Sequence, residues 1–355
     1  MNIETKSTTA TEKRMPLIGI TMGDPAGIGA EIAVKAMLCP EVEGICRPVI
    51  IGDANAVADA IRFTGLKGRE KSISKISEAA FEPGTVNVLD LKNVDMGGLI
   101  YGKVQPSAGR AAFEYIKRGI ELALEGSIDA VVTGPIHKEA LNQAGYDYSG
   151  HTEIFADLTD TSDYAMMLVD QGMRVVHVTT HVSLREACDL VKRNRVLTVI
   201  RLAHDAMQAL GIETPRIGVA GLNPHSGEHG LFGDEEIRQI IPAIKDAQAL
   251  GIIAEGPVPP DTLFAKTRSG QYDVAIAMYH DQGHIPLKTV GFTCDPETGK
   301  WSSVSGVNVT LGLPIIRTSV DHGVAFGKAG KGIANPESMV QAIQMAVELA
   351  KKRIH

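Results

Sequence analysis

Cysteines are scarce in this sequence, and their positions exclude two classes of small protein. The chain of 355 residues has four, Cys39, Cys46, Cys188 and Cys294, and no two of them form a C-x-x-C pair. Disulfide scaffolds and zinc ribbons both depend on closely spaced cysteines. We therefore expect neither, and the reducing cytoplasm is the simplest location for the protein.

Long apolar runs and basic clusters are also missing. No run of about 18 apolar residues occurs, so no membrane-spanning helix is expected. The formal net charge is −7 and no run of Lys and Arg exceeds three residues, which argues against nucleic acid as a partner. Residues 1–14 are polar and contain Glu4 and Glu12, which predicts a disordered tail and not a signal peptide. A small molecule is the expected partner.

The chain does contain an alternation of short apolar runs with helical patterns, which is typical of an α/β protein with strands covered on both faces. The clearest predicted helices are 108–124, 193–210, 234–250 and 337–352, the last after the cap Asn335-Pro336. The predicted strands are 17–22, 48–52, 86–89, 129–133, 175–180, 217–222 and 274–278. The polar segment Thr293–Ser305, which carries Trp301, is expected to be a surface loop.

A glycine-rich stretch, Gly23 to Gly29, follows the first strand and precedes a helical pattern at 30–38. Backbone N–H groups at a helix N-terminus bind anions, but a tight strand-to-helix turn is the alternative. No Gly-Lys-Ser/Thr closes the stretch, so it is not a P-loop, and Ile32 replaces the third glycine of a dinucleotide-binding fingerprint. Asp53, after the next strand, is likewise either a ribose ligand or a helix cap.

Three histidines follow the ends of buried strands. His181, His225 and His280 each come just after an apolar strand pattern, and open α/β sheets bind ligands beyond the carboxyl ends of their strands. One such histidine alone is more often structural, but three at equivalent positions point to one metal centre. Neutral imidazoles favour zinc-class metals over magnesium. Asp281 is placed to orient the ring of His280.

Further polar residues suit an anionic ligand. Lys288, Asn308 and Arg317 lie in one stretch of chain, and Lys and Arg near backbone donors bind phosphate or carboxylate. Lys138 and the pair His151-Thr152 open helical patterns after a strand, where helix capping is the alternative to ligand binding.

Other features carry no comparable signal. His137, His177, His204, His229 and His284 show no context of this kind, and Cys188 is expected to pack on a helix. The sequence has no G-x-S-x-G elbow and no H-E-x-x-H helix, so nucleophilic serine and zincin chemistry are not expected.

Taken together, these motifs resemble those of the 4-hydroxythreonine-4-phosphate dehydrogenase family, whose fold is of the isocitrate/isopropylmalate dehydrogenase type. The resemblance covers nearly the whole chain, between Leu17 and Val347. The motifs that carry it, in order, are TMGDPAGIGAEI, VVTGPIHKEALNQAGY, SGHTEIF, VTTHVSLREA, GLNPHSGEHGLFGDEE, GPVPPDTLF, AMYHDQGHIPLK and GVNVTLGLPIIRTSVDHG.

The resemblance implies roles for particular residues. A divalent metal, with zinc favoured over cobalt, manganese or magnesium, is bound by His181, His225 and His280 in a site shared between the two chains of a homodimer. The phosphorylated substrate is held by His151, Thr152, Lys288, Asn308 and Arg317. Segment 321–336 is similar to the adenosine-binding loop of isopropylmalate dehydrogenases, which implies NAD contacts at His322, Gly323 and Asn335.

The resemblance also implies two α/β domains with the active-site cleft between them. The outer domain is expected to be discontinuous, built from 15–130 plus 306–355. The inner domain, 131–305, is expected to carry the metal ligands and the dimer interface.

The implied reaction is NAD-dependent oxidation of a phosphorylated four-carbon 3-hydroxy acid, followed by decarboxylation of the β-keto acid. The metal stabilises the charge that develops on oxygen in both steps. Asp261 or Lys138 is the expected base.

The substrate branch is suggested by two departures from biosynthetic members, which typically have PGEPAG and GLPVLK where this chain has MGDPAG and GHIPLK. Here the chain looks more like paralogues that act on D-threonate or D-erythronate 4-phosphate than like enzymes of 4-hydroxy-L-threonine 4-phosphate. Segment 293–305 is an insertion relative to most of the family, and we expect it to alter substrate choice.

Other functions remain as alternatives. A dehydrogenase of the same fold that acts on a non-phosphorylated diol carboxylate, such as an aromatic cis-dihydrodiol, would not need Lys288 and Arg317. From other classes, the histidines suit a metal-dependent hydrolase or lyase without a redox cofactor, and the glycine-rich stretch suits an acyl-phosphate transferase. A non-catalytic binding protein is the last alternative. NADH formation separates all of these from a dehydrogenase except the diol enzyme.

Overall fold

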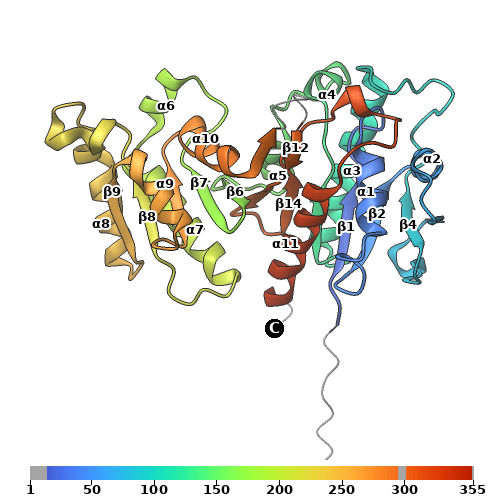
Figure 1. The fold of residues 1–355 in the computed structure, drawn as a ribbon, viewed down its shortest axis with the longest axis horizontal. Helices are drawn as coiled ribbons and strands as arrows, with labels where there is room; N and C mark the ends of the chain where they lie inside the picture. Colours follow the sequence, from blue (N-terminus) through green and yellow to red (C-terminus); the bar gives the residue numbers. More distant parts are fainter. Residues whose placement is uncertain (1–13, 295–300, 354–355) are drawn as a thin grey trace, which may run out of the picture.

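The computed structural model describes residues 14–294 and 301–353, which form one large twisted sheet flanked by helices (Figure 1). The sheet has twelve strands in the order β3-β4-β2-β1-β5-β14-β13-β6-β7-β10-β8-β9. Their bounds are β1 Leu17–Thr21, β2 Arg47–Gly52, β3 Arg69–Ile73, β4 Thr85–Asp90, β5 Ala130–Thr133, β6 Ala165–Asp170, β7 Met173–His177, β8 Ile217–Ala220, β9 Ala254–Val258, β10 Val274–Ala277, β13 Val307–Leu311 and β14 Arg317–Val320. All seven predicted strands are confirmed, each within three residues at its ends.

The four predicted helices are also confirmed, although segment 234–250 is divided into a π-helical turn, η3 (Glu236–Ile240), and α8 (Ile241–Ala249). Asn335 caps the last helix, because its Oδ1 accepts the Glu337 N–H at 2.9 Å. The predicted helices 108–124, 193–210 and 337–352 are α3 Pro106–Leu124, α7 Arg193–Ala209 and α11 Glu337–Arg353. The remaining α-helices are α1 Gly29–Met37, α2 Ala54–Thr64, α4 Lys138–Gln143, α5 His151–Leu158, α6 Leu184–Leu190, α9 Pro260–Arg268 and α10 His280–Gly291.

The sheet consists of two parallel sets of strands that run in opposite directions. β13 is antiparallel to β14 and to β6, and β6 is antiparallel to β7, while every other neighbouring pair is parallel. Three successive reversals therefore separate the set β3-β4-β2-β1-β5-β14 from the set β7-β10-β8-β9. Within the second set, β7, β10 and β8 are neighbours, so the residues that follow them share one edge of the sheet.

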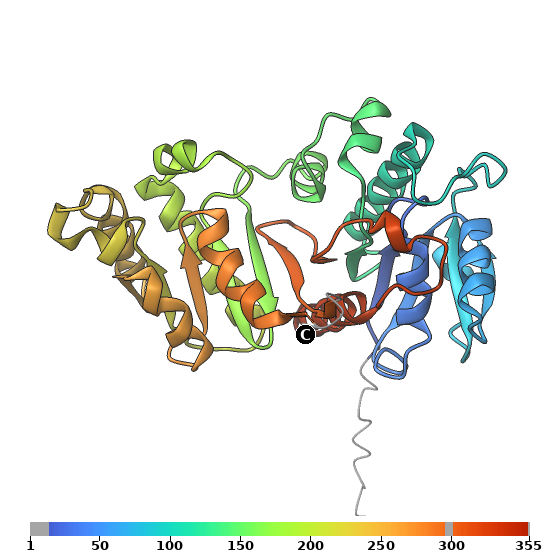
Figure 2. The same ribbon diagram turned by 45° about the horizontal axis from the view of Figure 1, so that its top comes forward.

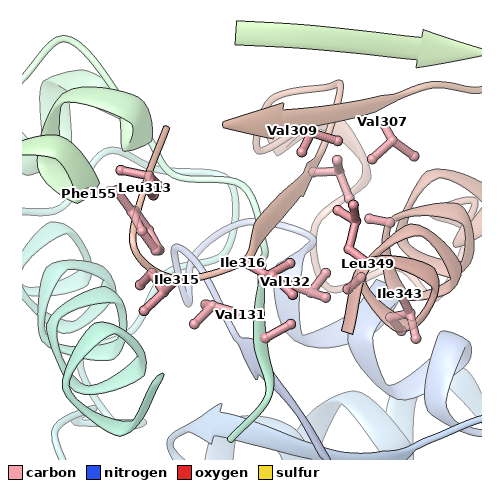
Figure 3. Close-up of a cluster of buried hydrophobic side chains, with 14 of the residues drawn as sticks. Val131, Val132, Phe155, Val307, Val309, Leu313, Ile315, Ile316, Ile343 and Leu349 are labelled. Atoms are coloured by element: carbon pink, nitrogen blue, oxygen red, sulfur yellow. The ribbon is translucent and has the colours of Figure 1, made fainter. Parts of the chain in front are cut away.

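A cluster of buried apolar side chains ties the end of the chain into the first set of strands (Figure 3). Val131 and Val132 on β5 pack near Ile316, and Ile343 and Leu349 on α11 cover the same region. The blue beginning and the red end of the chain consequently lie in the same half of the molecule (Figures 1 and 2).

The division into an outer domain of 15–130 plus 306–355 and an inner domain of 131–305 stays a prediction. The hydrogen-bonded sheet runs without interruption across that division, and its first boundary lies inside β5.

The strands that the sequence did not reveal include the buried central strands β6, β13 and β14 and the two edge strands of the sheet. β3 is an edge strand of sequence REKSI, and β9, at the other edge, contains Gly-Pro. Edge strands need no continuous apolar run and tolerate proline. The surface-loop prediction for Thr293–Ser305 is wrong at both ends, because β11 (Phe292–Cys294) and β12 (Trp301–Val304) pair as antiparallel strands. Aromatic and β-branched residues in those two runs favour strands, although polar turn residues dominate the segment.

Two further predictions concern the N-terminal tail and the lack of a membrane-spanning helix. Most of the predicted tail, residues 1–13, lies outside the described residues. Across the described ranges, no helix is sufficiently long and apolar to cross a bilayer.

Candidate active site

A cleft of about 470 Å3 collects most of the predicted site residues. It is lined by the segments that follow β5, β7, β10 and β14 and by residues of β6, β13, β14 and α10. The predicted residues that line it are Lys138, His151, Thr152, His181, His280, Lys288, Asn308, Arg317, His322 and Gly323. A hollow of about 520 Å3 beside β2 and β4 is lined by none of the predicted residues.

Three predicted residues do not line this cleft within one chain. Asn335 is exposed and caps α11. His225 lies in the turn η2 (Pro224–Gly230), and Asp261 lies in the first turn of α9, which packs against η2. Within the part of the chain that the structure describes, no three His, Cys, Asp or Glu side chains lie close enough together to hold a metal.

One part of the cleft wall is built around a buried arginine. Arg317 is 2% exposed, and its two terminal nitrogens donate to Thr310 Oγ1 at 2.9 Å and Thr133 Oγ1 at 2.8 Å. Burial lowers the pKa of the guanidinium to about 9, partly offset by the charge of Glu153. A buried cation without a carboxylate in contact favours an anion as its partner.

Polar atoms without partners surround this arginine. Arg317 Nε, His151 Nε2 and Asn308 Oδ1 are all shielded from solvent and make no hydrogen bond. Burial, and then the nearby Arg317 charge, hold the pKa of His151 well below its usual value. Because buried polar atoms are nearly always paired in native proteins, three unpaired atoms around one cation indicate a ligand site.

Two of the predicted metal ligands also line the cleft, His181 and His280. The ring centroids of His181 and His280 lie 5.7 Å apart. His280 Nδ1 lies 2.6 Å from Asp281 Oδ1, and His181 Nδ1 lies 3.9 Å from Glu153 Oε1. A carboxylate at Nδ1 leaves Nε2 as the metal-binding nitrogen, so both rings fit a zinc-class ion. The position predicted for Asp281 agrees with this arrangement.

α10 carries residues from the His280 part of the cleft to the turn after β14. Its twelve residues make a helix about 18 Å long that packs against β6, β7 and β10. It begins at His280 and brings Lys288 within 3.6 Å of Asp321 Oδ2, in the turn after β14. Burial raises the pKa of Asp321, and the nearby Lys288 opposes that effect.

Two histidines that the sequence analysis set aside belong to this site. His284 lines the cleft, and its ring stacks on His280 with centroids 3.6 Å apart. His177 is fully buried behind it, 4.7 Å from the His284 ring. The signal for His284 was its spacing, since residues i and i+4 share one face of a helix. His177 gave no signal, because it lies inside an apolar strand.

The buried His177 predicts a pH effect on stability. Burial, and then the neighbouring His284, lower the pKa of His177 from 6.5 to about 3. The unfolded chain takes up this proton near pH 6.5 but the folded chain resists it, so stability is full above pH 6.5 and is lost as the pH falls toward 3. The measurement is the free energy of unfolding by urea, for metal-free protein between pH 6.5 and 4. His177→Leu should reduce the decline of this free energy with falling pH by up to about 1.4 kcal/mol per pH unit. Equal slopes would contradict this account.

The glycine-rich stretch is a packed turn. A Cβ on Gly23 would lie 2.4 Å from the Pro135 carbonyl oxygen, and the Ile28 N–H donates to the Val324 carbonyl at 3.1 Å. Asp53 is a helix cap, because its Oδ1 accepts the Asn55 N–H at 2.9 Å. In both cases the structural alternative is correct.

The helix after this turn supports the segment predicted to bind NAD. Glu31, 1% exposed, accepts hydrogen bonds from Lys35 Nζ and from the Ala334 N–H, both at 2.7 Å. Lys35 also donates to the Gly332 carbonyl at 3.0 Å. This buried pair fixes the 332–334 turn against α1.

The likeness to known proteins extends over nearly the whole chain. A family model described as pyridoxal phosphate biosynthetic protein PdxA matches residues 44–346. The chain belongs to the PdxA family. A relative from Symbiobacterium thermophilum, provisionally named D-threonate 4-phosphate dehydrogenase, is 49% identical over 335 residues, 94% of this chain and 97% of the relative. A relative from Clostridium botulinum with the same provisional name is 48% identical and covers 95% and 98%.

Solved structures agree with membership of the PdxA family. The 4-hydroxythreonine-4-phosphate dehydrogenase of Klebsiella pneumoniae superposes with a TM-score of 0.85 at 45% identity, covering 96% of this chain and all of that one. A terephthalate 1,2-cis-dihydrodiol dehydrogenase of Burkholderia xenovorans gives a TM-score of 0.65 at 29% identity, covering 94% and 98%. The predicted family and fold class are confirmed.

Proposed function

We propose that this PdxA-family protein is an NAD- and metal-dependent dehydrogenase of a phosphorylated four-carbon 3-hydroxy acid, which also decarboxylates the β-keto acid formed. The observation that carries the proposal is that one cleft is lined by the buried Arg317 and by the His181–His280 pair. A phosphate fits the arginine and a metal-assisted carbinol fits the histidines. Relatives named as dehydrogenases support an oxidoreductase.

Among the candidate substrates, D-threonate 4-phosphate comes first, because relatives with 48–49% identity carry that provisional name. 4-Hydroxy-L-threonine 4-phosphate is the second, from the name of the Klebsiella enzyme. A non-phosphorylated diol carboxylate is less favoured, since it would leave Arg317, His151 and Lys288 without a phosphate to bind.

For the metal, the residues present fit a zinc-class ion held by His181, His280 and, from the partner chain of a homodimer, a third imidazole at His225 of the partner subunit. When bound, such an ion withdraws charge from the substrate oxygen in both the oxidation and the decarboxylation. NAD is expected along the turn after β14, with His322, Gly323 and Asn335. His322 Nδ1 lies 3.0 Å from the Gly323 carbonyl oxygen, which supports an ordered turn there.

The proton of the reacting hydroxyl needs an acceptor, and Lys138 and Asp261 both remain candidates for this base. Lys138 lines the cleft of its own chain. Asp261 lies with His225 outside that cleft, so it serves only if both are supplied from one subunit to the cleft of the other.

Exposed apolar side chains near the histidines support such a homodimer. Leu231 and Phe232 follow the His225 turn and are 72% and 48% exposed. Near His181, a hollow of about 300 Å3 is lined by Val182 and Leu184. Apolar surface of this kind marks a protein interface more often than free surface. The cytoplasm remains the expected location, from the cysteine pattern.

Mixed dimers test the shared site. Coexpressed His225→Ala and His280→Ala chains, each inactive alone, should recover about a quarter of wild-type activity, because half of the dimers are mixed and one of their two sites is intact. The matched control is His181→Ala with His280→Ala, which breaks both sites of every mixed dimer and should recover nothing. Absence of recovery in the first pair, with mixed dimers verified by native mass spectrometry, would refute a shared site.

The function itself is tested by NADH absorbance with 4-hydroxy-L-threonine, D-threonate and D-erythronate 4-phosphates, each with chelator and with added zinc, cobalt, manganese or magnesium. Metal-dependent NADH formation with the sugar acids is the expected result. Turnover of the amino acid alone would shift the assignment to pyridoxal phosphate synthesis. No turnover of any phosphorylated acid would overturn the proposal.

A further inference from the structure

A third imidazole in the cleft wall has no role in the function proposed above. His284 is 8% exposed, lines the cleft and lies on the same face of α10 as His280 and Lys288. These three residues are spaced by four positions, about 6 Å of helix rise each, so they share one face of α10. His284 therefore lies between His280 and Lys288 along the cleft wall, where it faces a ligand that contacts both.

The hydrogen bonding of this ring fixes its tautomer. His284 Nδ1 lies 2.9 Å from the backbone carbonyl oxygen of His280, and a carbonyl oxygen only accepts. Nδ1 therefore carries the proton, and in the neutral ring Nε2 is left as an acceptor. The wall consequently offers a hydrogen-bond acceptor one turn of α10 away from a donor, Lys288.

The ring is also held rigidly. It stacks on His280 with an interplanar angle of 13°, and the buried His177 packs against it from the sheet side. Gly283 makes room for this packing, since a Cβ there would lie 2.4 Å from His177 Nε2. A fixed acceptor discriminates between ligands by which of them places a donor opposite it.

The chemistry of the proposed substrate leaves one group to meet this acceptor. Its phosphate and carboxylate oxygens only accept hydrogen bonds, and its C3 hydroxyl gives up its proton in the reaction. Only the substituent on C2, a hydroxyl or an ammonium group, donates. We propose that His284 Nε2 accepts a hydrogen bond from the C2 substituent and makes His284 a specificity-determining residue. This inference rests on the proposed function.

The test compares two enzymes on two substrates, D-threonate 4-phosphate and its 2-deoxy analogue. For the wild type, removing the C2 hydroxyl should lower kcat/KM about 10- to 100-fold. The kcat/KM of His284→Leu should fall by a similar factor on D-threonate 4-phosphate. On the 2-deoxy analogue, the kcat/KM of this variant should differ from the wild-type value by less than about threefold. His284→Gln, whose amide oxygen still accepts, should recover part of the loss.

Two further measurements complete the experiment: cobalt binding, and thermal unfolding to verify that both variants are folded. In both variants the cobalt Kd should stay within about threefold of the wild-type value, since the proposal gives His284 no metal-binding role. Equal losses on both substrates, or loss of cobalt binding in His284→Leu, would overturn the inference, because the ring would then act through His280 or the metal. A wild type that oxidises neither phosphorylated acid would overturn the proposed function, and this inference with it, before any variant is compared.

Discussion

His280→Ala should remove the bound metal and lower kcat/KM by at least about a thousandfold. His280 opens α10 and lines the cleft, and its Nδ1 lies 2.6 Å from Asp281 Oδ1, which leaves Nε2 for the proposed ion. Losing that ligand removes charge stabilisation worth several kcal/mol in the transition state. Metal content after dialysis and NADH formation from D-threonate 4-phosphate are the two measurements.

His204→Ala is the matched control for this substitution. His204 lies on α7, outside the cleft lining, and also has a shielded nitrogen without a partner. It should keep both metal and activity. Retention of stoichiometric metal by His280→Ala would remove His280 from the ligand set, whatever its activity.

Arg317→Met should raise KM for the phosphorylated acid about a hundredfold or more, with a smaller effect on kcat. The guanidinium is buried and held by two threonine hydroxyls, so its contact with an anion is desolvated, and loss of one partner of such a contact costs about 2–5 kcal/mol. The KM of Arg317→Lys should lie between those of the wild type and Arg317→Met, because a single ammonium does not reproduce the planar guanidinium that reaches both hydroxyls. Steady-state kinetics with the substrate varied at saturating NAD provide the measurement.

Arg195→Met is the matched control, which separates an effect on substrate binding from an effect on folding. Arg195 is also partly buried and also holds a neighbouring oxygen, the Val178 carbonyl at 3.0 Å, but it does not line the cleft. It should lower the unfolding temperature without changing KM. An unchanged KM in Arg317→Met would contradict the anion site, and an equal rise in both variants would show that the effect arises from damage to the fold.

Much of the site was predictable because it depends on strand ends. His181 and His280 follow β7 and β10, and the sequence marks both strands as apolar runs. Arg317 was predictable because it follows three apolar residues, Pro314-Ile315-Ile316, where a surface arginine is less expected.

Other parts depend on contacts that local sequence does not encode. The edge strands β3 and β9 have one paired side only, so no continuous apolar pattern marks them. His177 and His284 became partners only when α10 packed against β7. The place of His225 depends on a left-handed turn from His225 to His229, which four non-glycine residues adopt against their intrinsic preference.

The central strands bear on how the cleft changes width. β6 and β13 join the two halves of the molecule through five directly paired residues, so backbone hydrogen bonds replace the flexible linker usual between domains. Flexible loops therefore do not form a hinge between β6 and β13. We expect the cleft to open or close through a change in the twist of the sheet. In the proposed complex, the pairing of β6 with β13 therefore limits how far the phosphate site can move relative to the metal site.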